Sequence, residues 1–189
     1  MDPGIQIYTL KIELLEIEPR IWRRVLVPGT ITLAQLHEVI QIAMGWTNSH
    51  LHEFIVGADS YSDPEFEIED AKSEYRYRLE RLAPRVSNAI AYEYDFGDGW
   101  EHQIRVESII EGDKRYPGKP FCLEGKRSCP PEDCGGVWGY ETFLKAIKNK
   151  KHPRHKEFVG WIGGSFDPEF FDLEAVNAEL RKSDLRPRW

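Results

Sequence analysis

One segment, from Tyr92 to His102, constrains the fold of this 189-residue chain more than any other. Its Asp98-Gly99 pair is a turn signal, and the residues on both sides alternate between polar and apolar side chains. Alternation with a period of two is typical of strands that bury one face. The segment therefore predicts a β-hairpin with strands over Ile90–Phe96 and Trp100–Ile110.

The register of this hairpin depends on the length of its turn. A two-residue turn would place charged residues of one strand opposite apolar residues of the other strand. A three-residue turn over Gly97–Gly99 pairs Tyr94 with His102 and places almost every apolar residue on one face. Burial favours the second register, so we predict that Tyr94 and His102 are cross-strand neighbours on the buried face, with Gly99 at positive φ.

This register brings two acids together on the polar face, because Asp95 then lies opposite Glu101. Like charges that oppose each other directly destabilise a sheet, so a buried pair needs a cation or a shared proton, whereas an exposed pair needs only solvent. Arg23 and Arg24 are the cations expected there. They are adjacent in a predicted strand, so their side chains point to opposite faces.

Acidic, imidazole and aromatic side chains crowd the hairpin tip and the Pro-Pro-Glu-Asp segment that follows it. The candidate ligand contacts among them are Asp95, Asp98, Trp100, Glu101, His102, Glu132 and Asp133. Carboxylates suit magnesium, calcium or manganese, and an imidazole widens the choice of metal. The alternative is a buried histidine beside a solvated acidic tip, with the Pro-Pro-Glu-Asp segment as a rigid connector. We expect no cofactor other than a divalent cation, and we assign no catalytic residue.

Hydrophobic periodicity predicts the remaining elements. Further strands are expected over residues 5–15, Ile21–Val27, 51–56 and Tyr75–Arg78. Helices are expected over Thr32–Gly45, Leu79–Leu82, Tyr140–Lys148, Pro153–Ile162 and Leu173–Lys182. A capping box at Thr32 and Gln35 begins the first helix, Gly45 ends it, and Asp172 caps the last helix. Residues 57–73 are acidic and read as a loop.

The length suits one domain over residues 1–189. We expect an α+β fold in which the Thr32–Gly45 helix packs on an antiparallel-rich sheet, with a C-terminal helical portion. The sheet-rich part spans about residues 1–111, an irregular loop spans 112–136, and the helical part spans 137–189.

The charge balance argues against a protein that binds nucleic acids in general. The formal net charge is −7, whereas affinity for a phosphate backbone requires clustered Lys and Arg. The basic stretch Lys145–Lys156 is the one candidate, and its simpler interpretation is a solvated helix end. No apolar run approaches the ~20 residues of a membrane span, and the first residues lack the pattern of a signal peptide. We therefore expect a cytoplasmic protein that does not bind membranes.

Cysteines, histidines and aromatic residues elsewhere give weaker signals. Cys122, Cys129 and Cys134 are odd in number and lack the paired knuckles of structural zinc sites, so we expect small buried residues that brace a loop. His50 and His52 lie on the same side of a strand or its approach, which is a weak metal signal. The aromatic residues expected in the core of the C-terminal half are Trp138, Tyr140, Trp161 and Phe166.

Several short motifs in a fixed order resemble one protein family. They are Ile21-Trp22-Arg23-Arg24, Leu36-His37, Gly45-Trp46, His50–Phe54, Tyr94–His102, Pro130–Gly136 with Gly139-Tyr140, and Phe166-Asp167-Pro168. They cover nearly the whole chain and resemble the plasmid pRiA ORF-three-like family. The resemblance implies an α+β domain and, for some relatives, a mobile-element setting, but it implies no activity. The residues themselves do not support recombinase chemistry, because no Ser or Tyr nucleophile stands within an arginine cluster.

Two classes of function follow from these patterns. The first, which we favour, is a non-enzymatic binding or accessory module linked to mobile elements, with an unknown protein or small ligand as its partner. The second is a metal-assisted hydrolase that uses the acids between Asp95 and His102. An enzyme predicts a pocket that gathers at least three of Asp95, Asp98, Glu101, His102, His50, His52 and Glu132.

Overall fold

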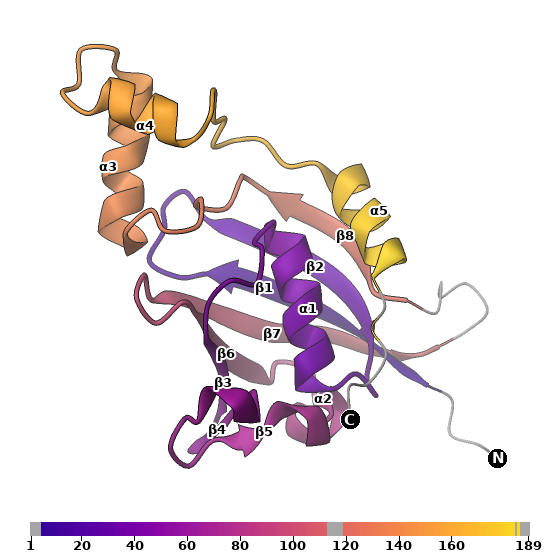
Figure 1. The fold of residues 1–189 in the computed structure, drawn as a ribbon. Coiled ribbons are helices and arrows are strands. Elements are labelled where there is room, and N and C mark those ends of the chain that lie inside the picture. The colour runs from indigo at the N-terminus through magenta and orange to yellow at the C-terminus, as the bar shows by residue number, and fades with distance from the viewer. Residues whose placement is uncertain (1–4, 113–118, 184, 186–189) are drawn as a thin grey trace.

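The computed structural model describes residues 5–112, 119–183 and 185, and an eight-stranded sheet lies at its centre (Figure 1). Its strands are β1 (Gln6–Leu14), β2 (Ile21–Pro28), β3 (His52–Val56), β4 (Asp59–Ser62), β5 (Lys72–Ser73), β6 (Ala89–Tyr94), β7 (Trp100–Glu111) and β8 (Phe121–Lys126). They lie in the order β5-β4-β3-β6-β7-β1-β2-β8, and every neighbouring pair is antiparallel except β4–β5. The predicted α+β class and antiparallel-rich sheet are confirmed.

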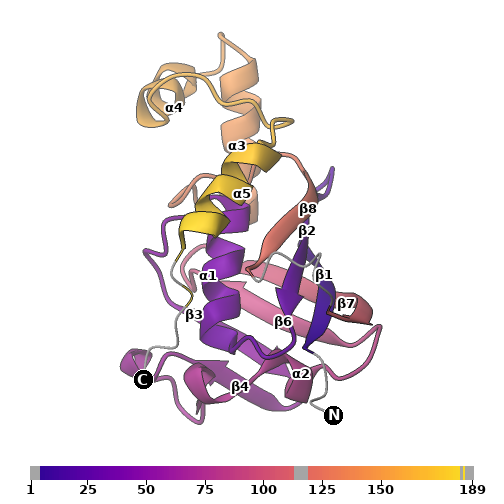
Figure 2. The same cartoon turned by 90° about the vertical axis from the view of Figure 1, so that its right-hand side faces the viewer.

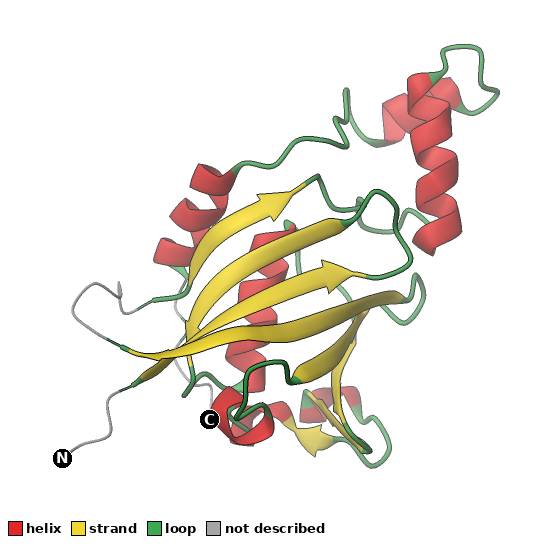
Figure 3. Cartoon of the chain, turned by 180° about the vertical axis from the view of Figure 1, so that it is seen from behind, coloured by secondary structure: helices red, strands yellow, loops and turns green. Residues whose placement is uncertain are grey.

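Helices cover one face of this sheet and extend beyond it. They are α1 (Leu33–Met44), α2 (Leu79–Leu82), α3 (Gly136–Lys148), α4 (His155–Trp161) and α5 (Leu173–Lys182), with 3-10 turns η1 (Pro64–Phe66) and η2 (Glu74–Arg76). In Figures 1 and 2, α1 and α5 lie next to each other against the sheet, whereas α3 and α4 project past its end. Seen from behind, the strands lie in front of α1 (Figure 3). Across the described residues, every helix is too short or too polar to span a bilayer.

The alternating sequence of β1 explains this layering. Leu10, Ile12 and Leu14 are at most 1% exposed and face the helices, while Lys11 and Glu13 between them lie on the outer face. Each fully buried leucine or isoleucine contributes about 1.5–3 kcal/mol relative to an exposed position. The two faces of the strand therefore differ strongly in hydrophobic free energy, and this difference selects the register of β1 in the sheet.

The helix α1 has the ends that the sequence predicts. The Thr32 hydroxyl accepts from the backbone of Gln35, and the Gln35 side chain accepts from the backbone of Thr32, which confirms the capping box. Gly45 ends the helix in the left-handed conformation, with φ 91°. Leu33 and Leu36 are buried against the sheet, so this helix forms the core layer above it.

The acidic stretch 57–73 contains more secondary structure than the predicted loop. It holds β4, η1 and β5, and β4 extends the sheet by pairing with β3. Tyr61 and Ser62 of β4 are buried, and the Tyr61 ring packs edge-on against Tyr77. The loop prediction was wrong because one aromatic residue among polar neighbours gives no periodicity, and only packing against a distant ring selects the strand.

The residues after this stretch are partly as predicted. The single helical turn over Leu79–Leu82 is confirmed as α2. The strand predicted over Tyr75–Arg78 was wrong, because the chain forms η2 there and Arg78 makes an isolated bridge to Thr32.

The stretch 112–136 is not wholly irregular, because it contains the edge strand β8, which pairs with β2. Residues 113–118 of this stretch lie outside the described residues. The side-chain amide of Asn177 on α5 exchanges two hydrogen bonds of 2.8 Å with the backbone of Cys122. This contact joins residues far apart in sequence, so no local pattern indicates the strand.

The three C-terminal helices are confirmed, although two have different ends. The helix over Leu173–Lys182 matches α5, and Asp172 caps it by accepting from the backbone of Ala175 at 2.9 Å. The helix α3 begins at Gly136 rather than Tyr140, and α4 is shorter than predicted.

Two of the aromatic residues expected in the core are exposed. Trp138 and Trp161 are 79% and 44% exposed, whereas Tyr140 is buried and Phe166 packs partly buried against the core. The prediction was wrong for the two tryptophans because α3 and α4 project beyond the sheet, which leaves part of their surface without a covering layer (Figure 1).

The hairpin forms at the predicted place with a longer turn. Tyr94 pairs with Trp100 and Tyr92 pairs with His102, so the turn spans residues 95–99. The predicted pairing of Tyr94 with His102 was therefore wrong. The buried face is nevertheless the expected one, because a shift of two residues keeps each side chain on its own face.

The conformation of Asp95 explains the longer turn. Asp95 leaves the strand with φ 59°, and its Oδ1 accepts from the backbone of Gly97 and Asp98 at 3.0 and 3.3 Å. A short polar side chain that binds its own turn in this way competes with the strand ladder. Gly99 has φ 67°, so its positive φ is confirmed.

The opposed acids on the outer face are not the predicted pair. Glu93, rather than Asp95, lies opposite Glu101, and Glu53 of β3 lies on its other side. Burial and these two neighbouring carboxylates raise the pKa of Glu93. Like charges therefore do oppose each other here, two residues away from the predicted position.

Arg23 and Arg24 point to opposite faces, as expected, but neither reaches the hairpin acids. Arg24 pairs with Glu107 and Glu124 on the outer face. Arg23 is 2% exposed, and its guanidinium donates at 2.7–2.9 Å to the backbone carbonyls of Trp22, Ala43, Lys126 and Arg127. The predicted pairing was wrong because the buried guanidinium is already saturated by backbone acceptors.

Candidate functional site

A loop that follows α1 carries His50 to the end of the sheet where the hairpin turns. Trp46 anchors this loop, because its ring stacks on Tyr94 at 5.0 Å and its Nε1 donates to the Pro130 carbonyl at 2.9 Å. The second contact also holds the Pro-Pro-Glu-Asp segment against the loop. Three segments far apart in sequence therefore meet at His50.

Three carboxylates surround the imidazole of His50. Its Nε2 lies 3.2 Å from Asp133 Oδ1, 3.6 Å from Asp95 Oδ2 and 3.7 Å from Glu132 Oε2. This Nε2 is buried and has no hydrogen-bond partner among the described residues. We call His50, Asp95, Glu132 and Asp133 the His50 cluster.

The carboxylates of the cluster are held by their own backbone and by neighbouring donors. Asp95 uses Oδ1 for its turn, which leaves Oδ2 directed at His50. Glu132 Oε1 accepts from the backbone of Thr47 at 2.8 Å and from the Tyr94 hydroxyl at 3.1 Å, and its Oε2, which lies 3.4 Å from the same hydroxyl, faces His50. No Lys or Arg ion pair reaches these carboxylates among the described residues.

Asp98 supports the cluster without joining it. Its Oδ2 accepts from the backbone of Gly135 at 3.1 Å, and its carbonyl oxygen would lie 2.5 Å from a Cβ at Gly136, which has φ 65°. The hairpin turn and the segment before α3 can approach this closely only because Gly136 lacks a side chain. Asp98 thus links the hairpin turn, which carries Asp95, to the segment that carries Asp133.

The other predicted contacts lie elsewhere. His102 is fully buried with its Nδ1 3.3 Å from the Tyr92 carbonyl oxygen, and burial lowers its pKa to about 4. Trp100 is fully buried next to Trp46, and Glu101 is exposed on the outer face. The structure therefore brings together Asp95, Glu132 and Asp133 and separates them from Trp100, Glu101 and His102.

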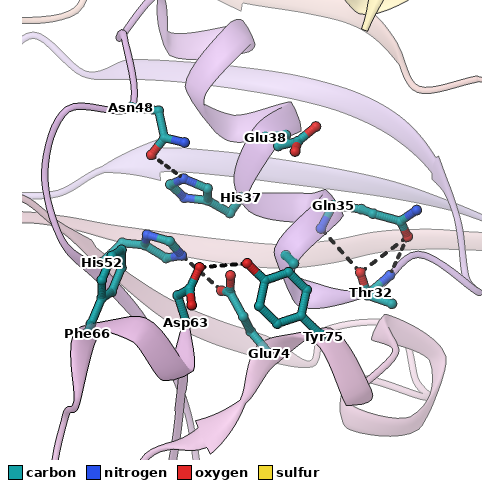
Figure 4. Close-up of a pocket in the computed structure, with 11 residues that line it drawn as sticks. Thr32, Gln35, His37, Glu38, Asn48, His52, Asp63, Phe66, Glu74 and Tyr75 are labelled. Carbon is teal, nitrogen blue, oxygen red and sulfur yellow. Dashed lines mark hydrogen bonds and ion pairs between the residues drawn. The ribbon is translucent and has the colours of Figure 1, made fainter. Parts of the chain in front are cut away.

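A small cavity lies beside the cluster, between α1 and the β4–η2 segment (Figure 4). We call it the His52 cavity. Its volume is about 80 Å³, and its lining includes His37, His52, Asp63, Phe66 and Glu74. Figure 4 shows Asp63, Glu74 and Tyr75 pointing toward one another below His37, with the Tyr75 hydroxyl donating to Asp63 Oδ2 at 2.6 Å.

The rings of His37 and His52 stack in this cavity at a centroid distance of 3.4 Å, with planes 7° apart. His37 Nε2 lies 2.8 Å from Asn48 Oδ1, and its Nδ1 lies 2.8 Å from the Tyr92 hydroxyl. Burial lowers the pKa of His37 to about 3 and that of His52 to about 4. Both rings are therefore neutral at physiological pH.

Among the Asp and Glu residues that the structure describes, Glu74 has the pKa that is shifted most. It is 2% exposed, and its Oε2 lies 2.8 Å from His52 Nε2. Burial raises its pKa to about 7, because the charged form loses its hydration, and the neighbouring Asp63 carboxylate adds to the rise. A carboxyl of this kind gains and loses a proton near neutral pH.

The His52 cavity shares lining residues with a cleft beside the His50 cluster. A wider cleft of about 520 Å³ is lined by His50, Asp95 and Phe96, and it shares Asn48, Asp63 and Phe66 with the cavity. Sequence reasoning named His50 and His52 only as a weak pair, and it missed His37, Asp63 and Glu74. His37 carried one signal, because a histidine among the buried positions of α1 needs a polar partner.

The three cysteines are buried free thiols, as expected. Burial raises the pKa of Cys122 to about 11 and that of Cys134 to about 12. Cys129 packs with its sulfur 3.3 Å from the Met44 sulfur. None of them joins the ligand grouping at His50.

Comparisons with known proteins bear out the family resemblance. A family model described as plasmid pRiA4b ORF-3-like protein matches residues 6–175. An uncharacterized protein y4hQ of Sinorhizobium fredii (strain NBRC 101917 / NGR234) is 41% identical, covering 95% of this chain and 92% of the relative. The crystal structure of MM3350, a protein of unknown function from Methanosarcina mazei Go1, has a TM-score of 0.82 and 38% identity, covering 90% and 97% of the two chains. These descriptions name no activity.

Proposed function

Because this chain belongs to the plasmid pRiA4b ORF-3-like protein family, whose relatives described above carry no named activity, we propose a function from geometry: the chain binds a divalent metal ion at the His50 cluster. His50 Nε2, Asp95 Oδ2 and Asp133 Oδ1 are the proposed ligands, with Glu132 Oε2 as a fourth. This proposal is a binding module, which is the class of function that the sequence favours, and it names a divalent metal ion as the ligand.

The convergence of ligand atoms supports this proposal most directly. The three atoms of His50, Asp95 and Asp133 lie within 4.8 Å of one another. In a tetrahedral site with bonds of about 2.0–2.2 Å, ligand atoms are about 3.3–3.6 Å apart. The distances from His50 to Asp133 and Asp95, 3.2 and 3.6 Å, match that separation.

The donor set points to a transition metal. One imidazole with carboxylates suits zinc, manganese or iron better than calcium, which prefers six to eight oxygen ligands. The wall residues Thr47 and Tyr94 hold Glu132 from outside the cluster, as neighbours of metal ligands commonly do. A protonated His50 would satisfy the same three carboxylates without a metal, and this is the competing explanation that an experiment must separate.

Metal titration separates the two explanations. Protein stripped with EDTA is titrated with Zn²⁺ and Mn²⁺ by calorimetry, together with the variants Asp95→Asn and His50→Gln. We expect one saturable site per chain, weakened on the order of 100-fold in both variants, since loss of a ligand costs at least as much as loss of a neighbouring support. Glu101→Gln is the matched control, because it removes one exposed charge from the same hairpin and should leave the affinity unchanged. Absence of saturable binding, or equal affinity in Asp95→Asn, contradicts the proposal.

A metal-assisted hydrolase is the second candidate, favoured by the cleft beside the cluster, which shares lining residues with the cavity that holds Glu74. Of the residues named for an enzyme pocket, only His50 and Asp95 line this cleft, so the expected gathering of three in one pocket is not met, although Glu132 Oε2 lies 3.7 Å from His50. A metal with three or four protein ligands leaves a position for water. Metal-dependent cleavage of chromogenic esters or phosphoesters that is lost in Asp95→Asn supports this candidate, and cleavage that persists in Asp95→Asn or without metal counts against it.

The family description names a plasmid but no activity, so it supports no particular reaction. The net charge of −7 supports an accessory role without general affinity for DNA.

A further inference from the structure

The His52 cavity has the chemistry of a second, different site. Its lining includes the carboxylates of Glu38, Asp63 and Glu74, and none of the residues that line it is Lys or Arg. Its volume is about 80 Å³, whereas a cavity needs only about 10–15 Å³ to hold one water molecule. The cavity therefore has room for a small cationic group.

An acidic lining alone does not define a site, but the buried groups here point to a ligand. Glu74 is 2% exposed and has His52 as its hydrogen-bond partner through Oε2, so its Oε1 remains for an occupant of the cavity. His52 is 3% exposed, and its buried Nδ1 has no hydrogen-bond partner within the part of the chain that the structure describes. A buried carboxylate has lost its hydration, and a bound cation offsets the free-energy cost of that loss.

The spacing of the acids argues against a metal ion in this cavity. The one group of three His, Cys, Asp or Glu ligand atoms that converge within 4.8 Å, among the described residues, is that of His50, Asp95 and Asp133. Asp63, Glu74 and His52 therefore stand too far apart for bonds of about 2.0–2.2 Å. An ammonium group bonds at about 2.7–2.9 Å and has three donors, so it spans wider sets of acceptors.

We propose that the His52 cavity binds the primary ammonium group of a small organic amine, with Asp63 and Glu74 as its acceptors. The Phe66 ring at the cavity wall favours a cation with an organic stem. The inference stands on the cavity and does not depend on metal at the His50 cluster. The cavity and the wider cleft beside His50 share Asn48, Asp63 and Phe66, so an amine too long for the cavity extends into that cleft.

The groups that face Glu74 make this binding depend on pH. They are His52 from β3, His37 from α1, Asp63 before η1 and Tyr75 of η2. The two histidines are neutral above about pH 5, so Glu74 is the group that changes charge near neutrality. Only its ionised form attracts an ammonium group, so affinity rises as the pH rises through about 7 and then becomes constant.

Calorimetry on EDTA-treated full-length protein tests this inference without the metal site. The probes are propylammonium chloride, 1-propanol as the neutral analogue of similar size, and potassium chloride as an inorganic cation. We expect saturable binding of propylammonium on the order of 1 mM, as for a fragment of four heavy atoms, and none of the other two. Affinity at pH 8 should exceed that at pH 6 by about tenfold, in proportion to the ionised fraction of Glu74.

Variants assign the binding to the cavity. Glu74→Gln should abolish the pH dependence and weaken binding at pH 8 at least tenfold, and Asp63→Asn gives a second, independent removal of an acceptor. Glu69→Gln is the matched control, because Glu69 is an exposed acid in the same stretch of chain. Equal binding of 1-propanol or of potassium, absence of saturation by propylammonium, or unchanged affinity in both cavity variants overturns the inference. Failure here leaves metal binding at His50 untouched, because that site is titrated separately.

Discussion

Replacing the buried carboxyl of Glu74 by an amide should make the protein more stable at alkaline pH. The pKa of Glu74 rises from 4.5 to about 7 on folding because burial removes its hydration. The folded state therefore holds the proton more tightly than the unfolded state does. The stability that this group contributes is present below about pH 4.5 and is lost as the pH rises toward 7. Above both values the charged carboxylate costs the folded state about 3 kcal/mol.

The variant Glu74→Gln removes this titration and keeps the shape of the side chain. Its unfolding free energy relative to the wild type should increase by about 2–3 kcal/mol between pH 5 and pH 8. Placing an amide next to His52 can change the unfolding free energy by an amount that is the same at every pH. The dependence of the difference on pH therefore comes from the titration of Glu74. The buried histidines act in the opposite direction, because their lowered pKa values reduce stability as the pH falls below about 6.5. Both proteins carry these histidines, so their effect cancels in the difference.

Urea unfolding followed by tryptophan fluorescence at several pH values measures this difference. Glu69→Gln, at an exposed position of the same stretch, should show no slope of this size. A difference that does not change with pH means that Glu74 is not held neutral in the folded protein. A difference of opposite sign, with the amide variant losing stability as the pH rises, means that Glu74 forms an ion pair with a protonated His52, and it refutes the desolvation argument.

Three further predictions concern the sheet, the cluster and the charge of the chain. Glu93→Lys places a cation between Glu53 and Glu101 and should raise the unfolding free energy by roughly 0.4–2 kcal/mol, counted as two cross-strand pairs, whereas a loss of stability in urea unfolding contradicts the role of these acids. Gly136→Ala adds a Cβ 2.5 Å from the Asp98 carbonyl at φ 65°, so thermal unfolding should begin at lower temperature and metal affinity at the His50 cluster should fall; unchanged values contradict the proposed link. The chain should not bind DNA tightly in a low-salt gel shift, because Lys145 and Arg154 of the basic stretch already pair with Glu141 and Glu157; micromolar binding that weakens with salt and is lost on charge reversal at Lys148, Lys151 and Lys156 shows the contrary.

The elements that the sequence predicted well are those whose signal lies within a few residues. The capping box at Thr32, the stop at Gly45, the cap at Asp172 and the alternation of β1 all depend on neighbours in the chain. The buried face of the hairpin was predictable for the same reason, because burial follows the period of two.

Local patterns along the chain specify which residues can form strands, helices and caps, and which side of the hairpin faces the core. Packing between distant segments specifies that β8 pairs with β2, because the Asn177 contact that holds β8 comes from a distant helix. It also specifies the hairpin turn, since the Asp95 side chain binds the turn backbone and leaves Oδ2 free to meet His50. His50, Asp95 and Asp133 come from three loops, and the burial that shifts Glu74 comes from α1 and β3 together. Proximity between loops and desolvation are properties of packing, so no spacing of residues along the chain contains them.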